Sequence, residues 1–344
     1  MTFSHLSFGR VPKGGKQNKL NCFLWSKQGS RVDFSLPFTF KNSLIYNSFM
    51  NEIELIDTIK NIIGTEFIGD DCAYLKDLGI VITQDSLVEN IHFKRDWCTP
   101  YQLGYKSIAV NISDILASGA EPKYITIALS LPKSVGSNFV EEFYKGASSA
   151  LNGAKIVGGD ITGSDKDIIV SVTAIGSTKG RNISSRANAK EGYIVITKGN
   201  HGSSALGLNE LINNRNNSEL IKEHLEPKLD INFANRLATS IIENFAMMDS
   251  SDGLADALFK IAEASNVKII SDYNKIPHLD IASYEQVMFG GEDYKLVAAI
   301  PEKYKDLFSD ASIIGKVVKY DGTRLDVSGH KYSTISELNT FNHF

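Results

Sequence analysis

Residues 99–120 read TPYQLGYKSIAVNISDILASGA, and this stretch is the strongest local indication of the fold. Thr99 is a favourable N-cap and Pro100 suits the first helical position, so a helix is expected over 100–120. Residues 108–117 are apolar nearly all round, which is typical of a helix buried inside a domain. The stretch therefore predicts a long buried helix.

One acid, Asp114, interrupts this apolar helix. An unpaired carboxylate in a protein interior costs several kcal/mol, so such a group needs a cation beside it. A salt bridge to Lys106 or Arg186 is one possibility and a metal ion is the other. Asn111 lies three residues before Asp114 and shares its helix face. The other acids described below favour the metal.

Outward from this helix, strand-like runs alternate with further helices, which indicates a mixed α and β (α+β) fold. The pattern breaks at residues 186–192 (RANAKEG), where we place a domain boundary. We expect an N-terminal domain over 50–189 and a C-terminal α/β domain over 190–344, with a ligand cleft between them. The expected strands are 79–83, 124–131, 155–157, 167–175, 193–197, 267–271, 295–300 and 313–318, and the further helices are 138–151, 204–212, 231–245 and 253–264.

Composition excludes several classes of protein. The 344 residues carry a net charge of −4, with 42% hydrophobic and 22% charged residues, as in ordinary globular proteins. No apolar run reaches the roughly 18 residues needed to cross a bilayer, and the three cysteines lack zinc-site spacing. Residues 1–49 hold seven Lys or Arg and one acid, so the rest of the chain is acidic. An acidic body argues against a nucleic-acid partner.

The basic segment 1–49 shows neither helical nor strand periodicity. A targeting peptide fits its charge but not its lack of an amphipathic stretch, and a nucleic-acid-binding arm would lack a recognisable motif. A disordered leader, or a chain that really starts at Met50, is the simplest interpretation. Met50 is followed at once by an amphipathic helical pattern with acids in its first turn.

Several further carboxylates lie at the ends of apolar runs: Asp70, Asp71, Asp85, Asp160, Asp249 and Asp252. Each alone is ordinary turn or helix-cap chemistry. The chain has no Gly-x-Ser-x-Gly, no His-Glu-x-x-His and no Gly-x-x-x-x-Gly-Lys-Ser/Thr motif. Hard oxygen ligands select Mg²⁺, which commonly bridges carboxylates to substrate phosphates. The residues therefore indicate metal-dependent chemistry on a nucleotide.

Eight ordered motifs carry a family resemblance: GDDCA (69–73), QDSLVE with HF (84–89, 92–93), LGYKSIAVNISDI (103–115), GAEP (119–122), GGD (158–160), DSSDGL (249–254), GGEDY (290–294) and NHF (342–344). Together they resemble the bacterial thiamine-monophosphate kinases, in the superfamily of aminoimidazole ribonucleotide synthetase and selenophosphate synthetase. The resemblance covers about residues 50–344.

The resemblance implies ATP-dependent phosphorylation of thiamine monophosphate in the cytoplasm. It also implies a homodimer whose N-terminal strands form a shared barrel. By position, Mg²⁺ ions would be bound by Asp71, Asp85, Asp114, Asp160, Asp249 and Asp252, with Thr83 and Gln84 beside them. ATP would contact Gly159, Asp160, Arg186, Ser251 and Tyr144. Thiamine monophosphate would contact His92 and Glu292.

Some positions depart from the family pattern. Gln84 stands where a hydroxyl residue is usual, and Leu338 stands where an aromatic residue commonly stacks on the substrate. Phe341 is the candidate replacement for that aromatic. Alternative functions are another superfamily activity, such as selenophosphate synthesis, and a non-catalytic scaffold that binds a magnesium nucleotide. The acids retained at six metal positions argue against the scaffold.

The acceptor chemistry fits a site without an acid-base residue. A phosphate ester has a second pKa near 6, so it is largely dianionic at neutral pH and needs no general base. The difficulty is bringing two polyanions together, which several Mg²⁺ ions and Arg186 would relieve. We expect direct in-line transfer without a phosphorylated enzyme.

Overall fold

The computed structural model describes residues 24–25, 31–32, 52–65 and 67–340. The chain divides into two compact units, Met1–Phe49 and Met50–Phe344. In the first, strands β1 (Leu24–Trp25) and β2 (Arg31–Val32) pair antiparallel. The interpretations of residues 1–49 and the role expected of Phe341 otherwise lie outside the described residues. Among the residues described, no helix combines the length and apolarity needed to cross a membrane.

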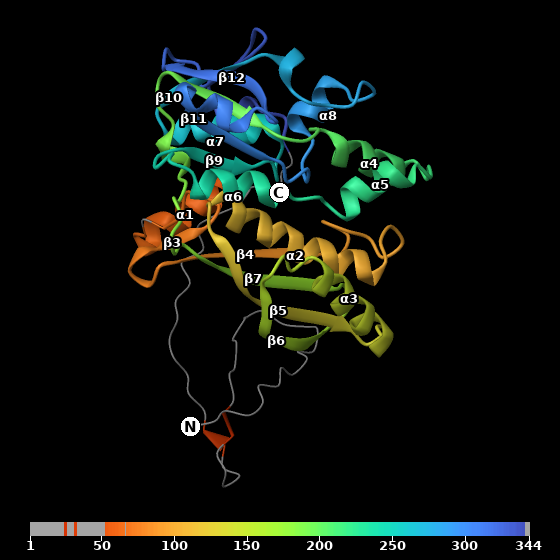
Figure 1. The fold of residues 1–344 in the computed structure, drawn as a ribbon. Helices are drawn as coiled ribbons and strands as arrows, with labels where there is room; N and C mark the ends of the chain where they lie inside the picture. The colour runs from red at the N-terminus through yellow and green to blue at the C-terminus, as the bar shows by residue number, and fades with distance from the viewer. Residues whose placement is uncertain (1–23, 26–30, 33–51, 66, 341–344) are drawn as a thin grey trace, which may run out of the picture. The chain divides into compact units, whose positions relative to one another are not determined.

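The second unit begins with helix α1 (Glu52–Ile63) and a five-stranded sheet. Its strands run in the order β3-β4-β7-β5-β6, and only β5 and β6 pair in parallel. Helices α2 (Pro100–Ala117) and α3 (Ser137–Ser149) belong to this half (Figure 1). The strands are β3 (Ala73–Leu75), β4 (Ile80–Val88), β5 (Glu121–Pro132), β6 (Lys155–Ser164) and β7 (Ile169–Ser177).

A seven-stranded sheet of order β14-β13-β10-β12-β8-β11-β9 follows. Its pairs are antiparallel except β10 with β13. The strands are β8 (Tyr193–Thr197), β9 (Ala246–Asp249), β10 (Val267–Ser271), β11 (Leu296–Pro301), β12 (Ser312–Lys319), β13 (Leu325–Val327) and β14 (His330–Tyr332). The helices are α4 (Ser203–Ile212), α5 (Ser218–Leu225), α6 (Ile231–Thr239), α7 (Leu254–Ala264) and α8 (Tyr284–Phe289).

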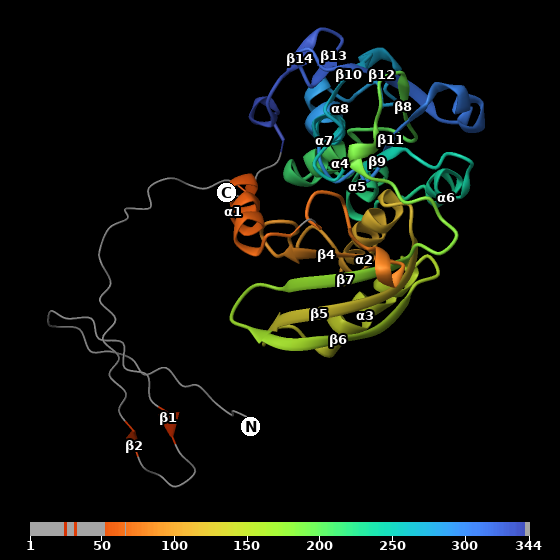
Figure 2. The same ribbon diagram turned by 90° about the vertical axis from the view of Figure 1, so that its left-hand side faces the viewer.

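Helix α2 lies between the two sheets (Figure 2), in contact with β4 and β7 on one side and with β9 and α6 on the other. Thr99 and Gln102 form the capping box that starts the helix, and Pro100 occupies its first position as the sequence predicts. It ends three residues earlier than expected because Gly119 turns the chain at φ +79°. A Cβ at Gly104 would lie 1.9 Å from the Phe143 carbonyl oxygen, so glycine permits the close approach of α3.

The expected α+β fold is confirmed, but the lengths of several elements differ. Strands β4 and β6 extend well beyond 79–83 and 155–157, so Asp85 and Asp160 lie within strands rather than after them. Gly158 and Gly159 do not end β6, because its pairing with β5 continues through them. The helix expected over 231–245 stops at Thr239, and the short elements β9, α5 and α8 were not anticipated.

Candidate active site

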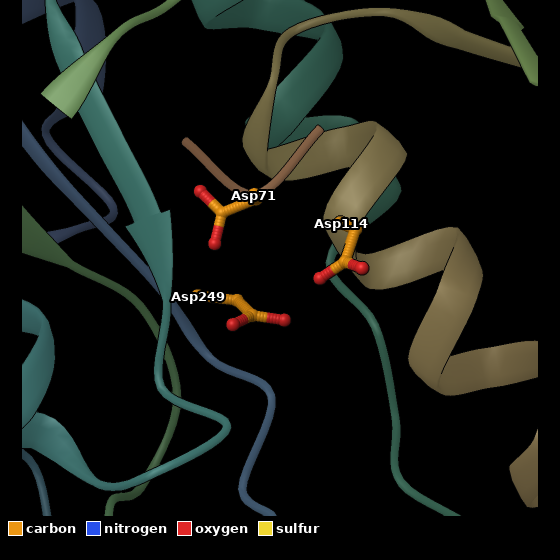
Figure 3. Close-up of side chains that lie close together, drawn as sticks. All are labelled: Asp71, Asp114 and Asp249. Carbon is orange, nitrogen blue, oxygen red and sulfur yellow. The ribbon is translucent and has the colours of Figure 1, made fainter. Parts of the chain in front are cut away.

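Three carboxylates meet beside α2. Oxygen atoms of Asp71, Asp114 and Asp249 all lie within 4.8 Å of one another. Figure 3 shows these three side chains lying close together. Asp71 precedes β3, Asp114 is on the last turns of α2, and Asp249 ends β9. Asp249 is fully buried, whereas Asp114 is half-buried because it faces a cavity. The two sheets and the central helix each supply or support one acid.

Hydroxyl groups are the main hydrogen-bond donors to this cluster. Thr83 Oγ1 donates to Asp114 Oδ2 at 2.6 Å, and the Ser113 hydroxyl donates to Asp249. Among the described residues, Arg186 forms the one ion pair of the cluster, from its Nη2 to Asp71 Oδ1 at 2.8 Å. A salt bridge from Lys106 or Arg186 to Asp114 is therefore wrong, because Arg186 binds Asp71 and Lys106 binds Glu292.

The electrostatics of the cluster call for a cation. Burial, followed by the charges of Asp85, Asp249 and Asp71, raises the pKa of Asp114 well above its ordinary value. Burial and the charge of Asp71 raise the pKa of Asp249 to about 7. Burial also raises the pKa of Asp71, although Arg186 opposes this. Three hard oxygen donors that repel one another fit a divalent cation such as Mg²⁺.

Two further predicted ligands lie close to this cluster. Asp85 faces α2, and its backbone NH donates to Asn111 Oδ1 at 3.2 Å. Burial, then the charges of Asp252 and Asp71, raises the pKa of Asp85 to about 6. Asp252 Oδ2 lies 3.3 Å from Lys260 Nζ, which also binds Asp256 at 2.7 Å. Asp85 and Asp252 are therefore placed to extend the acidic cluster.

A cavity of about 1120 Å³ opens beside the acids. Many of the residues expected to bind metal, ATP or substrate line it: Gln84, Asp85, His92, Asp114, Ser251, Asp252 and Glu292. The end of the described chain, Asn339 and Thr340, borders it as well, whereas Leu338 is buried. The cavity therefore connects the acids expected to bind metal with the residues expected to bind thiamine monophosphate.

Gly159, Asp160 and Tyr144 are not brought to this cavity in the single chain. Asp160 pairs with Ala128 on the sheet face opposite the buried Ile127 and Leu129, whereas Asp85 shares the face of buried Val172. Strand β6 is also three positions from β4, a separation of roughly 14 Å. Gln84 borders the cavity, but its side-chain amide turns to the same outer face as Asp160, where Thr173 Oγ1 donates to Gln84 Oε1 at 3.0 Å.

Tyr144 lies on α3 rather than on the cavity wall. Its ring packs edge-on against Phe143, with centroids 5.6 Å apart. Within one chain, Tyr144 therefore does not border the cavity in which the nucleotide is expected.

Sequence reasoning named Lys106 only as a possible partner of Asp114, and it missed two further titratable groups near the cavity, His224 and Lys260. Lys106 is a lone cation in the apolar helix α2, so the signal that pointed to Asp114 could also have found it. His224 on α5 lines the cavity, and Lys260 on α7 binds Asp252. No local pattern marks either of these, because both are brought in by tertiary packing.

Comparison with known proteins agrees with this geometry. The family model for the N-terminal domain of AIR synthase related proteins matches residues 69–178. The thiamine-monophosphate kinase of Aquifex aeolicus is 34% identical over 309 residues, covering 82% of this chain and 98% of that protein. That of Bacillus subtilis is 33% identical over 303 residues, covering 80% of this chain and 93% of its own length.

Solved structures are similar across the same region. The structure described as AaThiL complexed with AMPPCP and TMP has a TM-score of 0.78 at 31% identity, covering 86% of this chain and all of that one. A hydrogenase maturation protein, HypE, in complex with ATP has a TM-score of 0.60 at 16% identity, which shows a shared fold alone. The resemblance found in the sequence motifs is thus confirmed, and the chain belongs to the thiamine-monophosphate kinase family.

Proposed function

We propose that this protein phosphorylates thiamine monophosphate to thiamine diphosphate with ATP as phosphate donor. The observation that carries the proposal is the 1120 Å³ cavity, which has carboxylates Asp85, Asp114 and Asp252 along its wall and His92 and Glu292 elsewhere in its lining. Two anionic substrates can be accommodated there only if their phosphates are held where cations can gather. The acid-rich wall is that place.

The phosphate end of the site is formed by Asp71, Asp114 and Asp249. Mg²⁺ bound by these residues, with further ions at Asp85 and Asp252, would neutralise the phosphates and polarise the transferred group. Thr83 and Ser113 orient two of the carboxylates through their hydroxyl groups. Arg186 supplies a fork suited to phosphate from its position beside Asp71, and Ser251 borders the cavity.

The transfer itself asks little acid-base chemistry of the protein. The acceptor phosphate is its own nucleophile, which agrees with a cavity that is rich in carboxylates and has no lysine or cysteine among the described residues that line it. Oxygen of thiamine monophosphate forms a bond to the γ-phosphorus of ATP while the bond to the β,γ-bridging oxygen breaks, leaving ADP. We propose one in-line step, without a phosphorylated side chain.

The same proposal includes a homodimer formed through the N-terminal domains, 50–189, with the C-terminal domain over 190–344. The outer face of the five-stranded sheet exposes Tyr124 (49%), and its edge strand β6 exposes Val157 (58%) and Ile161 (62%), although these are large apolar side chains. Pairing of this face and edge with a second copy would cover them and form the expected strand barrel. It would also bring Gly159 and Asp160 against another chain. We propose a cytoplasmic location, as expected for a biosynthetic kinase.

Incubation of the protein with ATP, Mg²⁺ and thiamine monophosphate tests the activity. We expect thiamine diphosphate and ADP in equal amounts, and none in EDTA. Binding of ATP by folded protein that never makes product would favour the non-catalytic scaffold instead. With ATP chiral at the γ-phosphorus, in-line transfer predicts inversion, and retention would contradict the single step.

A further inference from the structure

Lys106 is a buried cation in the middle of α2. It is 3% exposed, and its Nζ makes a 2.8 Å ion pair with Glu292 Oε1. Its immediate neighbours Ser107 and Ile108 are buried as well. A buried ammonium is costly unless it is paired, so Lys106 depends on the Glu292 carboxylate. The negative end of the pair, Glu292, is the end that borders the cavity.

Among the described residues, no lysine or arginine pairs with the second oxygen of Glu292. Oε2 lies 3.5 Å from His224 Nδ1, which is longer than a hydrogen bond. Burial, then the charge of Lys106, lowers the pKa of His224 to about 4, so the ring is neutral at neutral pH. His224 Nδ1 is also 2.9 Å from Ser204 Oγ. Lys106 is thus the one buried cation that fixes this carboxylate among the described contacts.

The backbone of Glu292 is held just as firmly. Its φ of +65° is unusual for a residue with a side chain, and Tyr294 nearby has φ +51°. The Glu292 backbone NH donates to the Ser251 carbonyl at 2.6 Å. Such strained conformations persist where the surroundings impose them, often at ligand sites. Burial alone would raise the pKa of Glu292, but Lys106, His224 and His92 bring it below its ordinary value.

We propose that Lys106 is a positioning residue of the thiamine monophosphate site, fixing the Glu292 carboxylate so that Oε2 meets the cationic ring system of the substrate. The inference rests on the proposed function. The Lys106–Glu292 pair is neutral as a whole, but its negative end faces the cavity, so it attracts a cation at short range without leaving a net charge buried. Lys106 itself touches Glu292 and not the substrate.

The test compares steady-state kinetics of wild type, Lys106→Met, Lys106→Arg, Glu292→Gln and the double variant. For Lys106→Met we expect KM for thiamine monophosphate to rise about tenfold, with kcat and KM for ATP within about twofold. Lys106→Arg keeps the charge, so its KM for thiamine monophosphate should be at least about threefold lower than that of Lys106→Met. In the double variant the two KM effects should not add, because Lys106 acts through Glu292.

Lys268→Met is the matched control. Lys268 on β10 is 6% exposed and pairs with Asp321 at 2.9 Å, and neither residue lines the cavity, so it tests the loss of a buried ion pair as such. Its KM should equal that of wild type. If Lys106→Met does not fold, Lys106→Gln is used instead, because glutamine lacks the charge but retains a hydrogen-bond donor.

An unchanged KM in the folded Lys106 variant, additive effects in the double variant, or no recovery with arginine would each overturn the positioning role. These outcomes leave wild-type turnover intact and so do not touch the proposed function. Absence of thiamine diphosphate formation by folded wild-type protein would overturn both.

Discussion

Two buried acidic regions of this molecule solve the same problem differently. Asp293 lies beside the N-terminus of α4, although it is distant in sequence. The backbone NH groups of Gly202 and Ser204 donate to its two oxygens at 2.5 and 2.8 Å. In the cluster of Asp71, Asp114 and Asp249, three carboxylates share two hydroxyl donors, one guanidinium and the backbone NH of Ser251, which donates to Asp249 Oδ1 at 3.3 Å. Burial raises the pKa of Asp293 to about 6, so burial is common to both regions. What distinguishes the cluster is repulsion between like charges.

The comparison separates a carboxylate whose hydrogen bonds are completed within the chain from carboxylates whose charges the chain does not balance. The N-terminus of α4 supplies hydrogen-bond donors for both oxygens of Asp293, so removal of this carboxylate should destabilise the folded protein. In the cluster the chain supplies too few donors for three carboxylates that repel one another, and we propose that a cation from solution completes it. Removal of an acid is therefore expected to have opposite effects on stability and catalysis in the two regions.

The largest expected effect is on turnover. Asp114→Asn keeps the shape of the side chain and the Thr83 contact but removes a charge, so kcat/KM should fall at least about 1000-fold. Its unfolding free energy should equal or exceed that of wild type, because one like charge is removed from the cluster. Thiamine diphosphate formation and circular dichroism measure the two. Asp321→Asn, at an exposed acid, is the control, and activity retained by Asp114→Asn would contradict the assignment.

The next effect concerns stability. Asp293→Ala deletes the acceptor for two buried NH groups, so the unfolding free energy should fall by about 3 kcal/mol. Urea unfolding measures this loss. Stabilisation of the same variant by Mg²⁺ should persist, because Asp293 does not belong to the acidic cluster. A variant as stable as wild type would show that the helix start does not depend on this carboxylate.

Metal addition gives a smaller effect. Mg²⁺ at a hundredfold excess over its Kd should stabilise wild type by about 2.7 kcal/mol per coupled site, seen as a higher Tm than in EDTA. Asp114→Asn should lose most of this shift, whereas Asp293→Ala should keep it. Equal shifts in the two variants would mean that the cluster does not hold the ion.

The smallest effect is a pH slope without metal. The pKa of Asp249, raised from 3.8 to about 7, means that its protonated form stabilises the folded state. This contribution is complete below pH about 4 and is lost as the pH rises through 7. Relative to wild type, Asp249→Asn should therefore become more stable with rising pH, by at most about 1.4 kcal/mol per pH unit. Urea unfolding in EDTA at pH 5, 6 and 7 checks the sign.

The sequence predicted those features that depend on neighbours along the chain. Thr99 and Pro100 predict the start of α2, and the apolar residues around Asp114 single out this acid. The partners of the charges were not predictable in this way, because Lys106 meets Glu292 and Arg186 meets Asp71 only through packing of distant segments. Motif resemblance identified the acids themselves.

The remaining errors also have local causes. Helix α8 has 6 residues, too few for a reliable periodic pattern. The extent of β6 was underestimated because its glycines suggest a turn in isolation, whereas β5 holds them in a strand. Asp160 consequently lies on the outer face of the sheet, and the sequence alone could not show which face it would take.

Strand β4 carries two surfaces at once, since Thr83 and Asp85 point toward α2 while Gln84 and Ser86 point outward. Inserting or deleting one residue inside the strand would exchange these sets. The acid would then leave the cavity, and an uncharged amide would replace it, even though every amino acid of the motif remained. We therefore expect natural variation along Ile80–Val88 to consist of substitutions, with insertions and deletions confined to the loops at either end.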